Sequence, residues 1–477
     1  MLYVNKRLNF IDLFKLFVII QPVLDILTYF SLTSFQMTIT VGIITRVLFM
    51  GISILYIFFW NRNPLKKYIV IYLILLFTVL GAGLILNFFN KPVFYLFSEL
   101  QFYLKVLYFP ILFCTILLLF SSNVENNKTK QMLLSSVSFA MLLTAISMFI
   151  SIVTGTANST YDFVKSGYTG WFFAGNEISA IVAITFPLVL INSIKKTKQI
   201  GDFIFWIPTL LIASCALLIG TKVSYFAVLL TILISLIFSI IVFLYSRIKK
   251  LKSIKSIFYI LIFNILLSIF YFGITPLSPS YNNIAGDYVT INETVKENNQ
   301  NTADKSQKST HTNKKSNQKA ETDFETKRDS ILNSKILNIL LSSRDIYFDS
   351  IYNDFKNASF IHKLVGLGYA GFYEGEPKLI EMDFFDIFFS FGILGFTLIL
   401  LPLLIVFWKV IKTLFTHFFT FFRIENILLL FSLGLGLGVA FLAGHVLFAP
   451  AVSIYLTITM ALLFHFHTTI NSGSSFE

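Results

Sequence analysis

Twelve runs of about 20 mostly apolar residues, separated by shorter polar stretches, fill most of this sequence. A helix of that length spans the hydrocarbon core of a bilayer and satisfies its own backbone hydrogen bonds there. The runs do not alternate between apolar and polar residues, which excludes a membrane β-barrel. We therefore expect an all-α polytopic membrane protein with about 12 transmembrane helices. They are expected at residues 10–30, 38–60, 68–89, 100–120, 132–154, 176–193, 203–220, 223–245, 256–274, 384–408, 425–443 and 450–468.

The composition agrees with a chain solvated by lipid: 56% of its residues are hydrophobic and only 13% are charged. The formal net charge of +12 does not indicate nucleic-acid binding, because the Lys and Arg residues lie in short loops between apolar runs. Cys114 and Cys215 both fall inside expected helices, which predicts packed free thiols and no disulfide. No residue pattern calls for a metal or another cofactor.

The basic residues gather in alternate loops, which sets the expected orientation in the cell membrane. By the positive-inside rule, both termini are cytoplasmic. The long stretch 275–383 is then extracytoplasmic and separates helices 1–9 (residues 1–274) from helices 10–12 and a cytoplasmic tail (residues 384–477). The basic loops hold Lys6, Arg7, Arg62, Lys66, Lys67, Lys128, Lys130, Lys195, Lys196, Lys198, Arg247, Lys249, Lys250, Lys252, Lys255, Lys409, Lys412 and Arg423.

The extracytoplasmic stretch has two parts of different composition. Residues 292–330 are rich in Asn, Lys, Thr, Ser and Gln, and such a segment buries too little apolar surface to fold, so we expect disorder. Residues 342–357 regain apolar residues at helical spacing and predict an amphipathic helix on the outer membrane surface. Three glycines follow, at 366, 368 and 371. They predict a tight turn and not a phosphate-binding loop, because no strand precedes them.

Three acidic residues stand where this stretch re-enters the membrane: Glu381, Asp383 and Asp386. The helix dipole favours carboxylates in the first turn of a helix and explains one or two of them. A carboxylate in a partly desolvated site also has a raised pKa and can act as a general base. We therefore take these three residues as candidate catalytic groups.

Two cations fall on the same expected side as the acidic group. Arg344 follows Ser343 at a helix start, where the guanidinium, the hydroxyl and free backbone N–H groups are able to bind a diphosphate. Lys222, in Gly220-Thr221-Lys222, lies at another helix mouth. For both, the alternative is a structural role, as a solvated surface Arg and as an interfacial anchor.

Further candidates lie within or at the ends of the expected helices. Asp25 and Arg46 are expected to form an ion pair between the first two helices, with a substrate role for Arg46 as the alternative. Lys105 either reaches the outer cavity or extends to the membrane surface. His445 is a second candidate base or an interfacial structural residue. Near Trp171, the pair Asn176-Glu177 enters the membrane in a structural or a functional role.

With these residues placed, the chain resembles the O-antigen ligase and polymerase superfamily of bacterial surface-polysaccharide enzymes. The resemblance covers most of the chain: about twelve spans, cytoplasmic termini and one large outer loop between the ninth and tenth spans. The ligase motif is His, then Asn or Ser, about nine residues, and Gly-x-x-Gly; here Gly392-Ile-Leu-Gly395 puts Glu381-Met382 at the His position. That departure favours a polymerase or a divergent branch. Lys222 and Arg344 correspond to two family arginines that bind diphosphate, and Lys222 is again a departure.

The resemblance implies a metal-independent, inverting glycosyltransferase. Its partners are a polyprenyl-diphosphate-linked oligosaccharide donor, a glycan acceptor, membrane lipids and other polysaccharide-assembly proteins. Glu381 takes the proton of the acceptor hydroxyl, while Lys222 and Arg344 stabilise the departing diphosphate. The alternative function is a transporter or flippase for lipid-linked sugars. Transporters place broken helices and polar sites near the bilayer midplane, often with an internal repeat, whereas the ionisable residues here cluster at the outer mouth.

Overall fold

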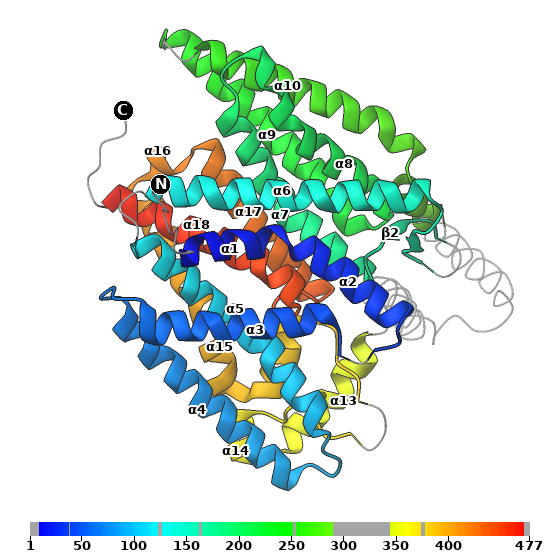
Figure 1. Ribbon diagram of the computed structural model, residues 1–477, viewed down its shortest axis with the longest axis vertical. Helices are drawn as coiled ribbons and strands as arrows, with labels where there is room; N and C mark the ends of the chain where they lie inside the picture. The colour runs from blue at the N-terminus through cyan, green and yellow to red at the C-terminus, as the bar shows by residue number, and fades with distance from the viewer. Residues whose placement is uncertain are drawn as a thin grey trace, which may run out of the picture.

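Long helices running side by side across the molecule make up nearly all of its regular structure (Figure 1). The computed structural model describes residues 9–37, 39–122, 126–161, 165–250, 254–289, 344–373 and 377–471. The helices are α1 Phe10–Ile19, α2 Gln21–Thr33, α3 Val41–Leu55 with a π-helical end η1 Tyr56–Trp60, α4 Lys66–Asn90, α5 Leu96–Ser122, α6 Asn126–Val153, α7 Gly175–Lys196, η2 Ile200–Trp206, α8 Ile207–Ile219, α9 Lys222–Ile248, α10 Ile254–Ile274, η3 Thr275–Leu277, α13 Arg344–Asn357, α14 Phe360–Val365, α15 Asp383–Thr416, α16 Phe418–Phe421, α17 Ile424–Leu442 and α18 Pro450–Asn471.

Ten helical stretches in the described part of the chain are long and apolar enough to cross a membrane. The chain is therefore an all-α multi-pass membrane protein. Ten of the twelve expected spans correspond to these stretches, and the first and the last are not among them. The first is two helices, α1 and α2, because Pro22 lies at the start of α2 and favours a new helix over a continuous one. The last corresponds to α18, which runs from Pro450 to Asn471 and is apolar over Pro450–His465.

Helix α7 lies at the centre of the bundle. It packs against α6, α8, α9, α17 and α18, and its side chains from Ile178 to Ser193 are all buried. Figure 1 shows α9 and α10 on one side of this centre and α3 and α4 on the other. One face of each peripheral helix is buried in the bundle, and apolar side chains cover its exposed face, as they do on lipid-facing helices.

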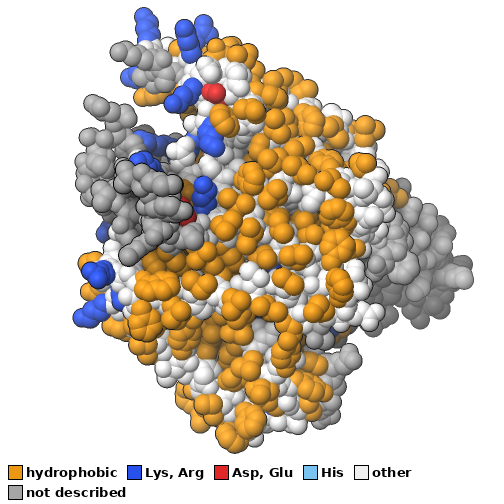
Figure 2. Space-filling view, in the orientation of Figure 1, with side chains coloured by type: hydrophobic (Ala, Val, Ile, Leu, Met, Phe, Trp, Pro, Cys, Tyr) orange, Lys and Arg blue, Asp and Glu red, His pale blue; other side chains and the backbone are white. Residues whose placement is uncertain are grey.

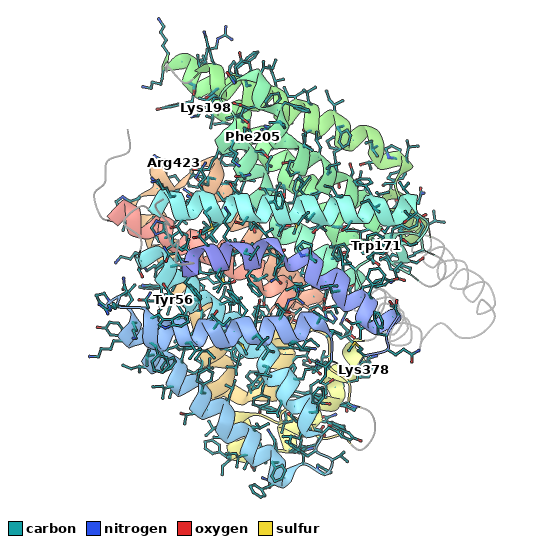
Figure 3. The ribbon with its side chains drawn as sticks, in the orientation of Figure 1. Tyr56, Trp171, Lys198, Phe205, Lys378 and Arg423 are labelled. Carbon is teal, nitrogen blue, oxygen red and sulfur yellow. The ribbon has the colours of Figure 1, made fainter. Side chains whose placement is uncertain are left out.

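The molecular surface matches this arrangement. Hydrophobic side chains cover most of the face shown in Figure 2. The Lys and Arg side chains gather along one edge, and Figure 1 places the start of α1 and the end of α18 on that same side. The opposite end carries a two-stranded hairpin, β1 Asn158–Ser159 and β2 Tyr168–Gly170, together with α13; Figure 3 labels Trp171 and Lys378 there.

Helix α15 is broken near its start, and the break holds a loop in place. Gly392 has φ 63° and ψ −172° inside α15, a conformation that glycine adopts far more readily than other residues. The freed carbonyls of Phe389 and Ser390 accept hydrogen bonds from the backbone N–H groups of Leu367 and Gly368, both at 2.9 Å. A side chain in place of Gly366 would meet Ser390 O at 2.1 Å. The glycine segment 366–371 is thus packed against the broken helix.

The second half of the expected outer stretch folds against this break. Helix α13, the described part of the 342–357 segment, packs on α15 through the buried side chains of Ile351 and Phe355. Ser343 and the segment 292–330 lie outside the described residues. The predictions of diphosphate binding for Ser343 and of disorder for 292–330 therefore stay predictions.

Candidate functional site

A polar cavity of about 250 Å³ opens at the end of the bundle that carries α13. Its walls come from α5, the first turn of α7, the segment that follows α14, and the loop between α17 and α18. The lining residues are Ser98, Gln101, Phe102, Lys105, Glu177, Tyr369, Leu379, His445, Phe448, Ala449 and Pro450. A cavity that combines ionisable groups, amide and hydroxyl groups and aromatic rings suits a polar ligand with several hydroxyls.

Three ionisable side chains of this cavity influence one another: Lys105, Glu177 and His445. Lys105 interacts electrostatically with Glu177, and His445 with Lys105. Burial lowers the pKa of His445; nearby Glu381 raises it, and Arg344 and Lys105 lower it. His445 is therefore neutral at pH 7 and is able to accept a hydrogen bond.

An ion pair between Arg344 and Glu381 lies beside the cavity. Arg344 Nη2 is 3.4 Å from Glu381 Oε2, and both groups interact electrostatically with His445. Glu381 and His445 have φ values of 64° and 60°, a backbone conformation that residues other than glycine rarely adopt. Such strain costs about 1–3 kcal/mol per residue and persists where the surroundings fix the backbone, often at functional sites. The sequence predicted that Arg344, Glu381 and His445 lie on one side, and the structure brings them together.

Asp383 and Asp386 are buried near this pair, and their carboxylates accept hydrogen bonds from backbone N–H groups. Asp386 accepts hydrogen bonds from the backbone N–H groups of Ile380 and Met382 at 2.8 and 3.0 Å, on either side of Glu381. Asp383 Oδ2 accepts from Val446 and Leu447 at 2.8 and 2.6 Å, just after His445. Neither carboxylate lines the cavity. The structure places them as supports for the two strained residues rather than as groups facing a substrate.

Lys222 is not among the cavity-lining residues. Its Nζ lies 2.9 Å from Asp287 Oδ2, and Lys165 binds the same carboxylate at 2.9 Å. Partial burial raises the pKa of Asp287, but hydrogen bonds from Lys165 and Lys222 outweigh burial and hold the pKa below its usual value. Asn283 ties the same two loops together through Ser166 and Gly220. None of the three residues expected to share a chamber lines this cavity: Arg344 and Glu381 pair beside it, and Lys222 pairs with Asp287 elsewhere.

A buried ion pair that sequence reasoning missed fixes one wall of the cavity. Lys91 Nζ lies 2.5 Å from Glu99 Oε1, and neither side chain is exposed. Together they bind the backbone of Tyr369: Lys91 donates to its carbonyl at 2.8 Å, and Glu99 accepts from its N–H at 2.9 Å. Asn87 Nδ2 donates to the carbonyl of Gly366 at 3.3 Å. The signal in the sequence was a Lys and a Glu eight residues apart on either side of a helix start.

The ion pair expected between the first two spans is present deeper in the bundle. Arg46 Nη2 lies 2.5 Å from Asp25 Oδ1, and Arg46 Nε donates to Gln21 Oε1 at 3.0 Å. Glu177 interacts electrostatically with both charged groups, so this cluster adjoins the inner side of the cavity. Because Arg46 lies on α3 and both Asp25 and Gln21 lie on α2, this is a structural ion pair that joins the two helices.

The remaining sequence candidates have structural surroundings. Trp171 donates to Thr156 Oγ1 at 2.9 Å and its ring packs near Phe30 at the outer end of the bundle. Cys114 and Cys215 are buried free thiols.

Lys105, Glu177 and His445 line the cavity, and the Arg344–Glu381 ion pair, which does not line it, interacts electrostatically with His445. Arg344 and Lys105 are able to stabilise an anion, and Glu381 and His445 are able to accept a proton. Ser98, Gln101 and Glu177 offer hydrogen bonds to hydroxyl groups. Such a set suits the transfer of a polyhydroxylated group away from an anionic leaving group.

Comparison with known proteins gives one match. Residues 8–466 match the model of the family described as O-antigen ligase like membrane protein. Searches of curated proteins and of solved structures gave no match.

Proposed function

This chain belongs to the O-antigen ligase like family of membrane proteins. We propose that it transfers a glycan from a polyprenyl diphosphate to an acceptor sugar at the outer face of the cytoplasmic membrane. The product is a polymerised or ligated surface polysaccharide. The observation that carries the proposal is that the Arg344–Glu381 ion pair interacts with His445, which lines a polar cavity together with Lys105.

The leaving group is a diphosphate, and the site offers it two cations. Arg344 provides a planar fork that binds two phosphate oxygens, and Lys105 adds a compact positive charge. Charge develops on the bridging oxygen as the bond to the sugar breaks, so cations fixed in place lower the barrier. We assign the second cation to Lys105 instead of Lys222, since Lys105 lines the cavity.

The acceptor hydroxyl attacks the anomeric carbon of the donor sugar. The new C–O bond forms as the bond to the diphosphate oxygen breaks, and the hydroxyl proton passes to Glu381. A single displacement of this kind inverts the configuration at the anomeric carbon. Neutral His445 accepts a hydrogen bond from a sugar hydroxyl. Asp383 and Asp386 are positioning residues, since their hydrogen bonds hold the backbone beside His445 and Glu381.

The surface supports the orientation that this reaction needs. Lys and Arg gather on the side where α1 starts and α18 ends, so we place both termini in the cytoplasm and the cavity on the extracytoplasmic side. The donor then approaches through the outer leaflet, and the acceptor glycan approaches from the aqueous side.

The test uses cells that make the polysaccharide. Glu381→Gln and Arg344→Ala should reach the membrane at wild-type levels yet accumulate unpolymerised lipid-linked units on the outer face. The control is Asp349→Asn on the exposed face of α13, which should leave the product unchanged. Wild-type product in both site variants would overturn the proposal. Lipid-linked units stranded on the cytoplasmic side would instead identify a flippase.

A further inference from the structure

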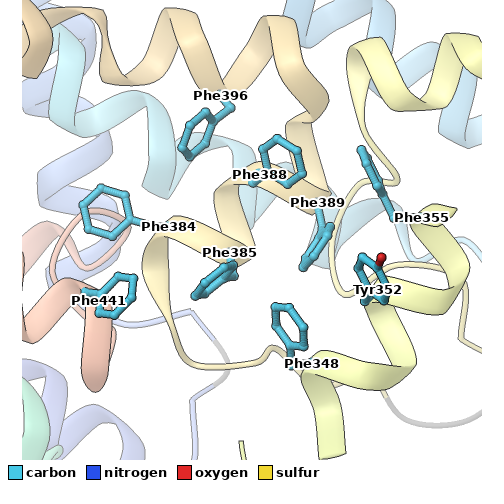
Figure 4. Close-up of a pocket in the computed structure, with 9 residues that line it drawn as sticks. All are labelled: Phe348, Tyr352, Phe355, Phe384, Phe385, Phe388, Phe389, Phe396 and Phe441. Atoms are coloured by element: carbon cyan, nitrogen blue, oxygen red, sulfur yellow. The ribbon is translucent and has the colours of Figure 1, made fainter. Parts of the chain in front are cut away.

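A cavity of about 910 Å³ lies at the connection between α3 and α4. Figure 1 shows this connection on the side where α1 starts, which the proposed orientation places in the cytoplasm. The cavity of Figure 4, between α13, α15 and α17, is lined by Phe and Tyr alone, whereas this one carries three cations and suits an anionic ligand. Its lining residues are Asn61, Arg62, Asn63, Pro64, Lys66, Lys67, Tyr68, Val70 and Ile71.

The loop that carries Arg62 is fixed by two asparagine side chains. Asn61 Oδ1 accepts a hydrogen bond from the backbone N–H of Asn63 at 2.8 Å, and Asn63 Oδ1 accepts one from that of Leu65 at 2.9 Å. Asn63 Nδ2 also donates to the carbonyl of Ser121 at 3.0 Å, which ties the loop to the end of α5. Because the loop is held in place before a ligand arrives, binding orders few groups and costs little conformational entropy.

The three cations of this cavity have no anionic partner in the part of the chain that the structure describes. No ion pair there joins Arg62, Lys66 or Lys67 to a carboxylate. By contrast, Glu425 pairs with two lysines of the other basic loops. The positive charge around the cavity is therefore left to an external anion.

Two of these cations stand in the first turn of α4, where the helix dipole disfavours positive charge. The N-terminus of a helix carries a partial positive charge of about half a unit. Lys66 and Lys67 are the first two residues of α4, whose first turn holds no acidic residue and has no side-chain cap. An anion bound here is attracted both by the side chains and by the helix N-terminus, and it offsets the repulsion between them.

The cavity continues along the apolar outer face of α4. Tyr68 and Ile71 line it and are 70% and 55% exposed. The candidate membrane span of α4 begins at Lys66, so these two side chains lie at the depth where the headgroup of a lipid meets its acyl chains. A soluble anion contacts the cations alone, whereas a phospholipid contacts both the cations and this apolar wall.

We propose that this cavity binds an anionic phospholipid from the leaflet on the side where α1 starts. Arg62, Lys66 and Lys67 surround the phosphate, with Arg62 supplying a planar fork for two of its oxygens. One acyl chain lies along Tyr68 and Ile71. A zwitterionic lipid presents the same phosphate together with a cation, which the three basic side chains repel. The site is separate from the polar cavity and does not depend on the proposed glycan transfer.

The test measures binding of three ligands to the full chain in detergent micelles by native mass spectrometry: dioleoyl phosphatidylglycerol, dioleoyl phosphatidylcholine and glycerol phosphate. The site variant is Arg62→Gln with Lys67→Gln, and both side chains are exposed, so the packed core stays intact. The matched control, Arg247→Gln with Lys249→Gln, removes one Arg and one Lys from the exposed end of α9, which does not line the cavity.

We expect wild type and control to bind phosphatidylglycerol at least ~10-fold more tightly than phosphatidylcholine, and the site variant to keep less than a ~3-fold preference. The charge-preserving exchange Arg62→Lys with Lys67→Arg should keep the wild-type preference, since the total charge is unchanged.

An unchanged preference in the site variant, or an equal loss in the α9 control, would overturn the site. Equal binding of the two lipids by wild type, or loss of the preference in the charge-preserving exchange, would contradict recognition by charge. Binding of glycerol phosphate as tight as that of phosphatidylglycerol would identify a site for soluble anions and would overturn the lipid assignment.

Discussion

Lys105 and Lys222 have the same side chain, yet the structure gives them different surroundings. Lys105 lines the polar cavity with His445 and Glu177. Lys222 shares Asp287 with Lys165, and 44% of its side chain is exposed. A cation already neutralised and solvated contributes little to a distant transition state, because water screens it. The sequence alone favoured Lys222, since its place at a helix mouth was visible and the partner at position 287 was not.

The two lysines therefore give a matched pair of variants. Lys105→Met should lower kcat by about 10²–10³-fold, the usual cost of removing one group that stabilises transition-state charge. Lys222→Met should lower kcat by less than about tenfold. Single-turnover rates on a polyprenyl-diphosphate donor make the comparison. A larger loss of kcat in Lys222→Met than in Lys105→Met would indicate that Lys222, and not Lys105, is the second cation that stabilises the diphosphate.

His445 predicts how the reaction depends on pH. Burial lowers the pKa of His445 from its ordinary value of about 6.5, with Glu381 opposing and Arg344 and Lys105 reinforcing that shift. The neutral ring, which accepts a hydrogen bond, is thus the main form above pH 6.5 and is lost only at lower pH. We expect any decline of kcat/KM that depends on His445 to be centred below pH 6.5. A decline centred at or above pH 6.5, absent in His445→Gln, would contradict this assignment.

At the scale of elements, the first turn of α15 organises the site. Its two buried carboxylates hold the backbone on both sides of Glu381 and just after His445. The acidic cluster was evident from the sequence, but its members have separate roles. Helix-dipole reasoning accounts for carboxylates in a first turn and does not show which of them bind backbone N–H groups. That distinction depends on the loop at 443–449, which is distant in sequence and adjacent in space.

The positioning role of Asp383 makes a prediction that a catalytic role does not. Asp383→Ala leaves two buried N–H groups without their acceptor and should cost ~2 kcal/mol or more in unfolding free energy, with most activity lost. Asp383→Asn keeps a carbonyl oxygen able to accept both hydrogen bonds, and should retain activity within about tenfold. Thermal unfolding and turnover of the purified variants check this. Loss of activity in a stable Asp383→Asn protein would indicate that the charge itself takes part.

The helices show what hydropathy predicts and what it does not. Long apolar runs place the spans well, because a segment of that length in lipid has to be helical. The division of the first span before Pro22 was open to prediction, since proline favours the first turn of a helix. The break in α15 was not. Gly392 was read as part of a motif; it has a positive φ, and a side chain there would meet the backbone of Leu364 and Gly366, which periodicity does not report.

At the scale of the whole molecule, charge and apolar surface are divided along the axis of the bundle. Basic residues gather along one edge, lipid-facing residues surround the middle, and the polar cavity lies toward the end that carries α13. The sequence predicted which residues share a side, because loops alternate between sides. It did not predict which of them meet, because helix order around the bundle depends on packing. The same limit hid the Lys91–Glu99 pair behind the cavity wall.

The position of the bound diphosphate tests the central claim most directly. A structure of the full chain in nanodiscs with a polyprenyl-diphosphate-linked donor would show it. We predict phosphate density within hydrogen-bonding distance of Arg344 and Lys105, with the donor sugar in the cavity beside Glu381 and His445. Density between Lys165 and Lys222, with the cavity empty, would contradict the account.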